Sequence, residues 1–350
     1  MKFSIFFIPS CEEGESYQEE YDNLMEQCVI ADELGFDTAW VAEHHFSRVG
    51  MCPDALMVAL AIAQKTKKIR VGTAISIVPF HNPIRLAEQA ALVDVLSGGR
   101  LDFGIGRGSQ PKEFQGFNID PSESRERMQE GIEVITRLLA GETLTFHGKY
   151  YSCIDTEIYP KPVQDPLPIW ISGTSPETYE YAAKNGFYVM ASASHKGPEH
   201  YLEKIEIFKN AMRKDGKDPE SCEYLMAHNI HVTDDPESAW KEIEPAESWY
   251  LNYRSEVNSI EMPIEQKESL KRNMSYKLSI REQIEGGGVI GSPEKVIKDI
   301  ERLENEFKIN HVMNFLLRGI NQRDAIKSLE RFAKEVMPHF KKKEVQSSAD

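Results

Sequence analysis

The chain alternates short apolar runs with longer segments in which apolar residues recur every three or four positions. The first run, 2–9, is rich in Phe and Ile and predicts a β-strand. In the next segment, 17–34, the apolar side chains fall on one face of a helix, and they are Tyr21, Leu24, Cys28, Ala31 and Leu34. Gly35 follows at the position where helices commonly end. The pattern therefore predicts a strand followed by a packed helix.

This strand-then-helix unit occurs eight times along the chain. The predicted strands are 2–9, 36–42, 69–78, 100–106, 168–172, 187–192, 223–233 and 311–317. The predicted helices are 17–34, 53–66, 83–97, 122–140, 175–185 and 196–214, helices within 236–306, and 322–337. Eight such units favour a closed parallel barrel over an open sheet. We therefore expect an α/β fold, a (β/α)8 TIM barrel with insertions.

A barrel of this kind needs about 250 residues, and the chain has 350. Two segments are the predicted insertions. Residues 141–166 contain a turn at His147-Gly148-Lys149 that predicts a hairpin, and residues 245–290 are polar and end in Gly286-Gly287-Gly288. We expect one barrel domain over 1–340 and a polar tail over 341–350.

Composition limits the kinds of partner. The net charge of −15 argues against a basic surface for nucleic-acid phosphates. The apolar run 55–63 is about half of a membrane span, and the N-terminus lacks the pattern of a signal peptide. Five cysteines without a C-x-x-C pair are typical of a reducing compartment, not of a disulfide framework or a structural zinc site. We expect a soluble cytoplasmic protein with no nucleic-acid or membrane partner.

Two adjacent histidines close the second predicted strand, in Glu43-His44-His45-Phe46. Chemistry in such barrels is found where strands end. Neighbouring residues of a strand point to opposite faces, so only one histidine can face the barrel mouth. The pair is for this reason a poor metal site, and no H-E-x-x-H motif is present, so we expect no metal. A catalytic imidazole and a polar strand end with capping histidines remain as alternatives.

The fourth predicted strand ends in Gly104-Ile105-Gly106-Arg107-Gly108. The spacing is G-x-G-x-G, and Pro111 with about ten further residues precedes the next predicted helix. A dinucleotide fingerprint requires a helix N-terminus directly after its glycines, so this interpretation is rejected. The glycines and Arg107 could allow close approach to a flat or phosphorylated ligand. A simple turn with a surface arginine is the alternative.

The fifth predicted strand runs into Gly173-Thr174-Ser175-Pro176, which predicts a helix with a hydroxyl cap and proline at its first position. Ordinary capping explains this pattern. The same geometry also presents N–H groups and hydroxyls to an anion. Together with Arg107 these groups could form a two-sided phosphate clamp.

Taken together, the motifs resemble those of the bacterial luciferase-like flavin monooxygenases. The matching motifs are Glu43-His44-His45-Phe46, Val71-Gly72-Thr73-Ala74, Ser97-Gly98-Gly99-Arg100-Leu101-Asp102-Phe103-Gly104, Arg107-Gly108, Trp249-Tyr250 and Gly291-Ser292-Pro293-Glu294. The resemblance covers most of the chain. It implies a (β/α)8 barrel that binds reduced FMN or, in some branches, the deazaflavin F420.

The resemblance also implies roles for individual residues. His44 is the catalytic imidazole near the flavin and the substrate. The flavin phosphate is held by Arg107, Thr174, Ser175 and Thr178. Ala74 and Ile75 are joined by a non-proline cis peptide that bulges against the isoalloxazine ring, whose other side is lined by Met190, Ala191 and Ser192.

One position departs from the family pattern. Gly106, on the expected cofactor-binding strand end, stands where the light-emitting α subunit has a reactive cysteine, and the long insertion also diverges. The resemblance therefore does not extend to light emission or to a long-chain aldehyde substrate.

The expected activity is that of a flavin-dependent monooxygenase that receives reduced FMN from a separate flavin reductase. Oxygen adds to the flavin C4a, and the resulting hydroperoxide oxygenates a small, largely apolar organic substrate. The alternatives are an F420-dependent oxidoreductase that transfers hydride on the same barrel and a non-catalytic flavin-binding subunit. The presence of His44, Arg107 and the hydroxyl cap in one chain argues against the last.

Helix 53–66 is apolar around its whole circumference, and helix 83–97 is nearly so. The outer helix of a barrel needs only one apolar stripe. We therefore expect a twofold homodimer in which these helices form a four-helix interface, with Glu88 as a buried or rim acid and His45 as the candidate partner of Glu88. The alternative is that insertion 245–290 covers them.

Overall fold

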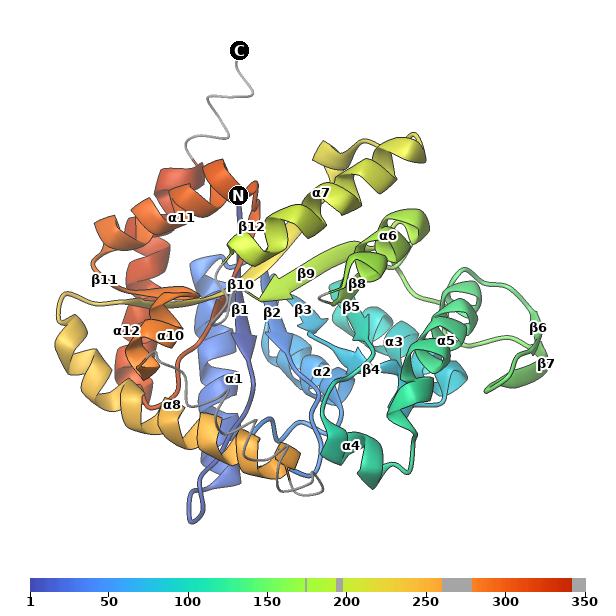
Figure 1. Ribbon diagram of the computed structural model, residues 1–350, viewed down its shortest axis with the longest axis horizontal. Coiled ribbons are helices and arrows are strands. Elements are labelled where there is room, and N and C mark those ends of the chain that lie inside the picture. Colours follow the sequence, from blue (N-terminus) through green and yellow to red (C-terminus); the bar gives the residue numbers. More distant parts are fainter. Residues whose placement is uncertain (174, 193–197, 260–278, 342–350) are drawn as a thin grey trace. The chain divides into compact units, whose positions relative to one another are not determined.

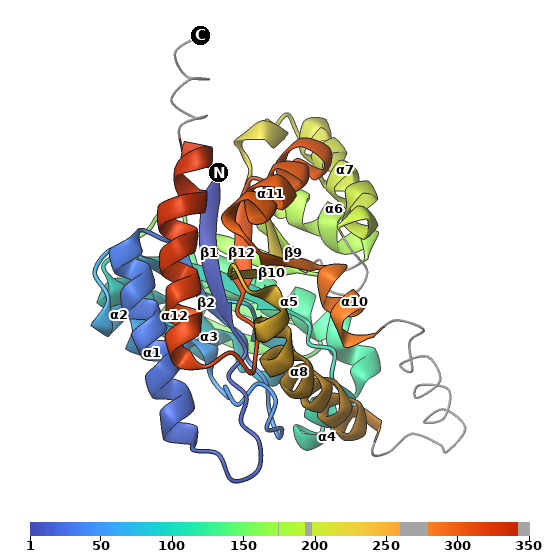
Figure 2. The same cartoon turned by 90° about the vertical axis from the view of Figure 1, so that its left-hand side faces the viewer.

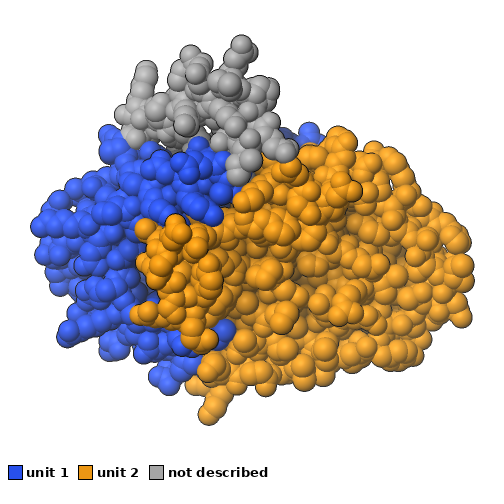
Figure 3. Space-filling view, turned by 90° about the horizontal axis from the view of Figure 1, so that it is seen from below, with its two compact units in different colours: residues 1–7, 22–37, 173–350 blue, residues 8–21, 38–172 orange. Residues whose placement is uncertain are grey.

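Parallel strands alternate with helices along the chain, and the fold is the (β/α)8 barrel that the sequence pattern predicts (Figure 1). The computed structural model describes residues 1–173, 175–192, 198–259 and 279–341. Contacts divide the chain into two compact units, which Figure 3 colours separately. Unit 1 comprises Met1–Phe7, Asp22–Asp37 and Gly173–Asp350, and unit 2 comprises Ile8–Tyr21 and Thr38–Ser172.

Unit 1 contributes four strands of the barrel, and they are β1 (Lys2–Phe7), β9 (Tyr188–Ser192), β10 (Tyr224–Val232) and β12 (His311–Phe315). Strand β12 pairs in parallel with β1 and with β10, and β10 also pairs with β9. The sequence pattern missed a further short strand, β11 (Gly288–Gly291), which pairs with the end of β10. Its glycine-rich sequence carries no alternation, which explains why it was missed.

The helices of unit 1 are α1 (Tyr17–Leu34) from Asp22 onward, α6 (Pro176–Asn185), α7 (Glu199–Lys214), α8 (Pro236–Ser259), α10 (Ile280–Glu285), α11 (Pro293–Phe307) and α12 (Gln322–Arg331). Helices α1 and α12 lie side by side (Figures 1 and 2), and Gln27 donates to Gln322 at 2.6 Å. The chain continues from α12 into a π-helical segment whose Phe332 packs on Phe3 and Phe36. Amphipathic helices thus cover this half of the core with their apolar faces.

Unit 2 contributes the other four barrel strands in the order β2 (Thr38–Val41), β3 (Arg70–Thr73), β5 (Leu101–Gly106) and β8 (Ile169–Ser172), all parallel. Its helices are α2 (Ala55–Lys65), α3 (Pro83–Ser97), α4 (Pro111–Gly116) and α5 (Ser124–Leu139). In the core, the rings of Trp40 and Trp170 meet edge to face at 5.3 Å. Gly72 makes room for them, because a Cβ there would lie 2.3 Å from Trp40.

Several predicted elements differ from the structure. The predicted strand 69–78 is interrupted after β3 and resumes as β4 (Ser76–Ile77), and the Ala74–Ile75 bond between them is cis, as predicted. The segment after Arg107 was predicted to lack a helix, and this is wrong, because α4 begins at Pro111. A helix of less than two turns is too short to show a periodic pattern, which explains the error.

The two predicted insertions also appear differently. Residues 141–166 contain the predicted hairpin, with β6 (Leu144–His147) antiparallel to β7 (Ser152–Thr156). The second insertion was predicted to begin at 245, whereas α8 continues through Pro245 to Ser259. Residues 260–278 of that insertion lie outside the described residues. In the described ranges, no helix combines the length and the apolar character needed to span a membrane.

Candidate active site

The residues after β2 give the two predicted histidines different surroundings. The side chain of His44 is 21% exposed, whereas His45 is buried and its Nε2 lies 3.0 Å from Oε1 of Glu43. The His44 N–H donates to the carbonyl of Cys52 at 3.0 Å, which fixes the backbone at this position. Of the two histidines, His44 is the one that a small molecule can reach.

A buried carboxylate from α4 holds the His44 ring. Oε1 of Glu113 lies 2.9 Å from Nδ1 of His44 and accepts the backbone N–H of His45 at 3.0 Å. An oxygen of an ionised carboxylate only accepts hydrogen bonds, as Oε1 does from the His45 N–H. We therefore assign the imidazole proton of His44 to Nδ1, which leaves Nε2 as an acceptor. Nε2 of Gln110 also lies 3.0 Å from Nδ1, so this tautomer requires the Gln110 amide to be turned over so that its oxygen faces the ring.

The second oxygen of Glu113 is unusual. The Glu113 side chain is 1% exposed, and among the described residues its Oε2 is buried without a hydrogen-bond partner. Buried polar atoms are nearly always paired, and exceptions are often found where a protein binds or transforms a ligand. Glu113 thus holds the His44 ring through Oε1, while its Oε2 remains available as a hydrogen-bond acceptor.

Glu43 forms a second buried carboxylate–histidine cluster beside this one. It accepts hydrogen bonds from His45, from Nε2 of His81 at 2.8 Å and from the backbone N–H of Ile77 at 3.2 Å. Burial acts to raise the pKa of Glu43, but the hydrogen bonds from His45 and His81 outweigh it and lower the pKa. The pKa of His81 is raised, because the bond and charge of Glu43 outweigh the effect of burial. An ionised Glu43 therefore ties the end of β2 to the segment after β4.

The cis peptide is hydrogen-bonded to the same strand end. Ala74 donates its N–H to the carbonyl of Val41 at 2.8 Å, and the carbonyl of Ile75 accepts the Glu43 N–H at 3.3 Å. The Ile75 side chain fills the space above Gly106, where a Cβ would lie 2.3 Å from Ile75 Cδ1. A cysteine at this position would displace Ile75, which gives a structural reason for the glycine.

Gly50 determines where the His44 ring can lie. Its φ of +75° is in the left-handed region, and a Cβ added to it would lie 2.4 Å from His44 Cδ2. Both the conformation and the contact require glycine. The sequence pattern did not single out Gly50, Gln110 or Glu113, since none of them belongs to a strand end or a recognised motif.

Arg107 follows directly after β5 and is exposed. Its Nη1 donates to the Ser124 hydroxyl at 3.4 Å. Within the described ranges the guanidinium has no ion-pair partner. Its positive charge is therefore available to an anion.

Ser175 precedes α6 with Pro176 at the first helical position, but the predicted hydroxyl cap is wrong. The Ser175 hydroxyl lies 3.2 Å from the Thr178 hydroxyl and does not bond to the backbone of the first turn. Gly173 makes room for Thr178, because a Cβ at 173 would lie 2.5 Å from that side chain. Two hydroxyls thus lie at the positive end of a helix dipole, where an anion is favoured. Thr174, which belongs to the same prediction, lies outside the described residues.

The three predicted ring-lining residues close β9. Met190 is 4% exposed, Ala191 is half-buried and Ser192 is exposed. Exposure therefore increases toward the carboxyl end of the strand, which is the functional end in barrels of this class. The structure brings His44, Glu113, Ile75 and Gly106 together within unit 2, and Ser175 and Thr178 within unit 1.

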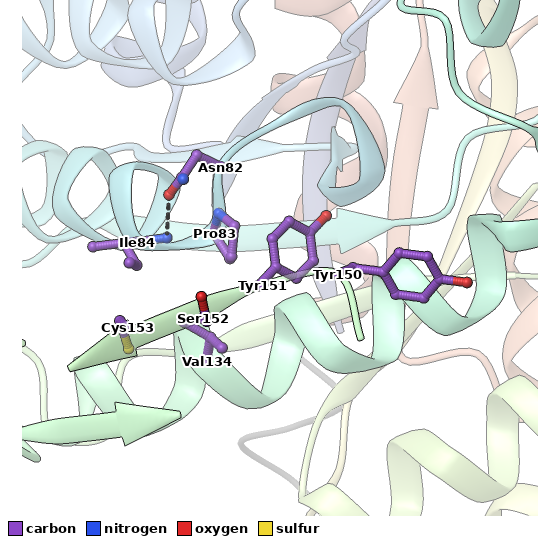
Figure 4. Close-up of a pocket in the computed structure, with 8 residues that line it drawn as sticks. All are labelled: Asn82, Pro83, Ile84, Val134, Tyr150, Tyr151, Ser152 and Cys153. Carbon is purple, nitrogen blue, oxygen red and sulfur yellow. Dashed lines mark hydrogen bonds between the residues drawn. The ribbon is translucent and has the colours of Figure 1, made fainter. Parts of the chain in front are cut away.

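Cavities are also found away from these positions. Figure 4 shows one of about 240 Å³ in unit 2, lined by residues at the beginning of α3, on α5 and on the β6–β7 hairpin. Its Asn82 side chain accepts the Ile84 N–H at 3.0 Å and so caps α3. A second cavity, of about 330 Å³, lies in unit 1 around His231. Neither cavity includes a predicted site residue.

Comparison with known proteins places these features in a family. The model of the luciferase-like monooxygenases matches residues 1–307. The oxygenase component of the flavin-dependent trigonelline monooxygenase of Acinetobacter baylyi is 28% identical over 99% of this chain and 97% of its own length. Limonene 1,2-monooxygenase of Rhodococcus erythropolis is 29% identical over 88% of this chain and 79% of its own.

Solved structures agree with this match. The monooxygenase RslO1 of Streptomyces bottropensis has a TM-score of 0.85 at 25% identity and covers 97% of this chain and 100% of its own. An F420-dependent secondary alcohol dehydrogenase has a TM-score of 0.76 at 22% identity over 96% and 98% of the two chains. The second likeness shows the fold alone.

Proposed function

The chain belongs to the luciferase-like monooxygenase family, and on this premise we propose that it is the oxygenase component of a two-component system that uses reduced FMN. It is an oxidoreductase, and its relatives include a flavin-dependent trigonelline monooxygenase and a limonene 1,2-monooxygenase. In our proposal a separate flavin reductase supplies reduced FMN, and O₂ provides the oxygen atom that is transferred to a small, largely apolar organic substrate.

The observation that carries the proposal is the pairing of His44 with Glu113. A partly exposed imidazole at a barrel strand end, with Nδ1 bound to a buried carboxylate, is arranged for proton transfer at Nε2. The carboxylate holds the ring in one orientation and stabilises the imidazolium that forms when Nε2 takes a proton. A non-catalytic flavin-binding subunit would not need this arrangement.

The residues present fit a flavin phosphate and ring. Arg107 carries a charge with no ion-pair partner among the described residues, and the hydroxyls of Ser175 and Thr178 are not used for capping. We assign phosphate binding to these three residues and to Thr174. When bound, reduced FMN supplies the electrons that activate O₂.

The ring-binding residues would exclude water from the reaction. The Ile75 side chain packs against Gly106. It is apolar and offers one surface for a flat ring. Ala74 shares the cis peptide with Ile75. Met190, Ala191 and Ser192 are assigned to the other side of the ring, where Met190 and Ala191 add further apolar surface. A dry site strengthens the electrostatic effect of His44 and Glu113.

Cofactor choice tests the proposal. Binding to the native state raises its stability by about 2.7 kcal/mol at a ligand concentration of a hundred times Kd. We expect FMN to raise the melting temperature, F420 to leave it unchanged, and riboflavin to act more weakly than FMN. A rise with F420 and none with FMN would favour the hydride-transferring alternative.

We also propose a homodimer formed through α2 and α3. Within the chain these helices are linked by the Gln64 side chain, which donates to the Leu96 carbonyl at 3.1 Å. Three of their apolar residues are exposed to solvent, namely Met57 (68% exposed), Leu96 (49%) and Leu92 (43%). An apolar surface of this kind is typical of a face covered by another helix pair.

The predicted partner of Glu88 needs correction. His45 was the candidate, but its Nε2 is bound to Glu43 within the same chain. Glu88 is exposed on α3.

The five free cysteines accord with a reducing compartment, and the cytoplasm is part of the proposal.

A further inference from the structure

Arg318 follows β12 and is positioned by three neighbours within unit 1. Its guanidinium carbon lies 3.5 Å from the centroid of the Tyr250 ring and 5.1 Å from that of Phe315. Its Nη1 lies 3.1 Å from Oε1 of Glu247. These contacts place the guanidinium against one aromatic face, with its charge balanced by one carboxylate.

The neighbouring glycine fixes this position further. Gly319 has a φ of +82°, and a Cβ there would lie 2.3 Å from the carbonyl oxygen of Glu242. The loop after β12 can therefore approach the backbone of α8 closely. Glu247 and Tyr250 are three residues apart on α8, so they present a carboxylate and a ring on the same side of the helix.

One edge of the guanidinium is left unused. The Arg318 side chain is 13% exposed, yet its Nε and Nη2 are buried and have no hydrogen-bond partner among the described residues. Leaving buried donors unpaired is unfavourable. Glu247 accepts the backbone N–H of Arg318 and, of the guanidinium nitrogens, engages Nη1 only, so it leaves Nε and Nη2 without a partner.

The unused edge has the geometry of a specific recognition element. The N–H groups of Nε and Nη2 are parallel and match the two oxygens of a carboxylate or a phosphate. The strand end before Arg318 is at the functional face of a (β/α)8 barrel. The partly exposed ring of Phe315 provides an apolar surface near the guanidinium, whereas the Tyr250 ring is 6% exposed and is covered by it.

We propose that Nε and Nη2 of Arg318 form an oxyanion-binding site that takes the carboxylate of the organic substrate, whose apolar body lies on the neighbouring Phe315 ring. This inference rests on the proposed function and specifies its substrate class. The flavin phosphate is the other oxyanion in the reaction, and it is already assigned to Arg107, Ser175 and Thr178. The substrate is accordingly apolar in its body and anionic at one end.

Calorimetric titration tests this site with benzoate as the probe and benzamide as its uncharged counterpart. Arg318→Lys keeps the positive charge but removes the paired donors. Arg281→Lys is the matched control, since Arg281 also lies over a ring, that of Trp240, but uses both Nη atoms on Glu237. We expect benzoate to bind the wild-type protein, to bind Arg318→Lys roughly ten- to a hundredfold more weakly, and to bind Arg281→Lys with unchanged affinity.

Equal affinity for benzoate and benzamide, or equal benzoate affinity in Arg318→Lys and wild type, would overturn the proposal. Loss of FMN affinity without loss of riboflavin affinity in Arg318→Lys would overturn it as well, by assigning the edge to the flavin phosphate. The side-chain Nε–H signal of Arg318 in the wild-type protein gives a second readout that needs no variant to fold. It should shift with benzoate and not with benzamide. An Arg318-dependent benzoate site in a protein that fails to bind FMN would overturn the proposed function and the substrate assignment that rests on it, and would support only the oxyanion site itself.

Discussion

Nδ1 of His44 and Oε1 of Glu113 lie 2.9 Å apart, although 69 residues separate them in the sequence. One residue closes a barrel strand, and the other lies on a short helix after a glycine-lined strand end. The same carboxylate oxygen accepts the backbone N–H of His45, so the backbone after β2 fixes the position of the Glu113 carboxylate. This pair gives the site a base whose orientation is fixed.

Replacing Glu113 by Gln should reduce turnover without a comparable effect on FMN binding. The variant keeps the size of the side chain but loses the charge that favours the Nδ1–H tautomer and the imidazolium. A charge-assisted hydrogen bond contributes about 1.5–3 kcal/mol, which corresponds to roughly ten- to a hundredfold in kcat. His44→Ala should cost about 10²- to 10⁴-fold.

Nitrogen NMR of His44 reports its tautomer, which would not change if the role of Glu113 were merely structural. The wild-type protein should show the proton on Nδ1, and Glu113→Gln should shift the population toward the Nε2–H tautomer. An unchanged tautomer together with unchanged turnover would refute the role of Glu113.

Gly50→Ala should displace the His44 ring. The new Cβ would lie 2.4 Å from His44 Cδ2, and the φ of +75° adds its own cost of about 1–2 kcal/mol. Gly35→Ala is the control, because Gly35 has a φ of +82° and nothing within 4 Å of the added Cβ. Both variants should lose stability in denaturant unfolding, with the larger loss in Gly50→Ala because of the added overlap, but only Gly50→Ala should lose turnover. Equal activity in the two variants would contradict this role of Gly50.

The fold could be predicted because its main elements have strong periodic patterns. The boundaries of α1 and α3 agree with the predicted helices, and β5 agrees with its strand to within one residue. The pattern failed for α4, whose six residues are too few to show a helical period. It also failed at β11, where glycines take the place of alternating apolar residues.

The site was only partly predictable for a different reason. Arg107 follows directly after β5 and His44 lies three residues after the end of β2, so knowledge of the fold class points to them. Glu113 gives no such signal, because its role depends on α4 folding back onto the end of β2. The free edge of Arg318 depends in the same way on contacts with α8, which sequence spacing does not reveal.

Arg107→Ala should weaken FMN binding roughly ten- to a hundredfold while leaving riboflavin affinity nearly unchanged. Riboflavin has the same ring but no phosphate, so the comparison isolates the charge. Fluorescence titration of both ligands provides the measurement. An equal loss for the two would show that Arg107 supports the ring site or the fold and does not bind phosphate.

Leu96→Glu should convert the dimer to a monomer. The side chain is 49% exposed within one chain, and a charge buried between two copies of α3 would be strongly unfavourable. Ile154→Glu is the control, since Ile154 is 73% exposed on the β6–β7 hairpin and belongs to neither of these helices. Light scattering should give twice 39.9 kDa for the wild type and for Ile154→Glu, and 39.9 kDa for Leu96→Glu. A wild-type monomer would refute the interface.

His231 should make the protein less stable in mild acid. Burial lowers its pKa from 6.5 to about 4, against the opposing charges of Asp324 and Glu242. Between these two pH values the unfolded chain binds a proton that the folded chain does not. The free energy of unfolding should therefore fall as the pH decreases from about 6.5 to about 4, by up to about 3 kcal/mol from this residue.

Unfolding in urea at several pH values measures this effect. His231→Asn should lack that part of the pH dependence, and His339→Asn, at a histidine that is 39% exposed, should retain it. An identical slope in His231→Asn and wild type would contradict the buried neutral histidine.

The reaction of bound reduced FMN with O₂ tests the proposed oxygenase most directly, because it requires no knowledge of the substrate. The protein is loaded with reduced FMN without oxygen, mixed with aerated buffer, and followed for flavin oxidation and for release of hydrogen peroxide. We predict tight binding of reduced FMN and a release of peroxide that is slower than from free reduced FMN and is altered by His44→Ala. No binding of reduced FMN, or a time course identical to that of the free flavin, would contradict the proposed function.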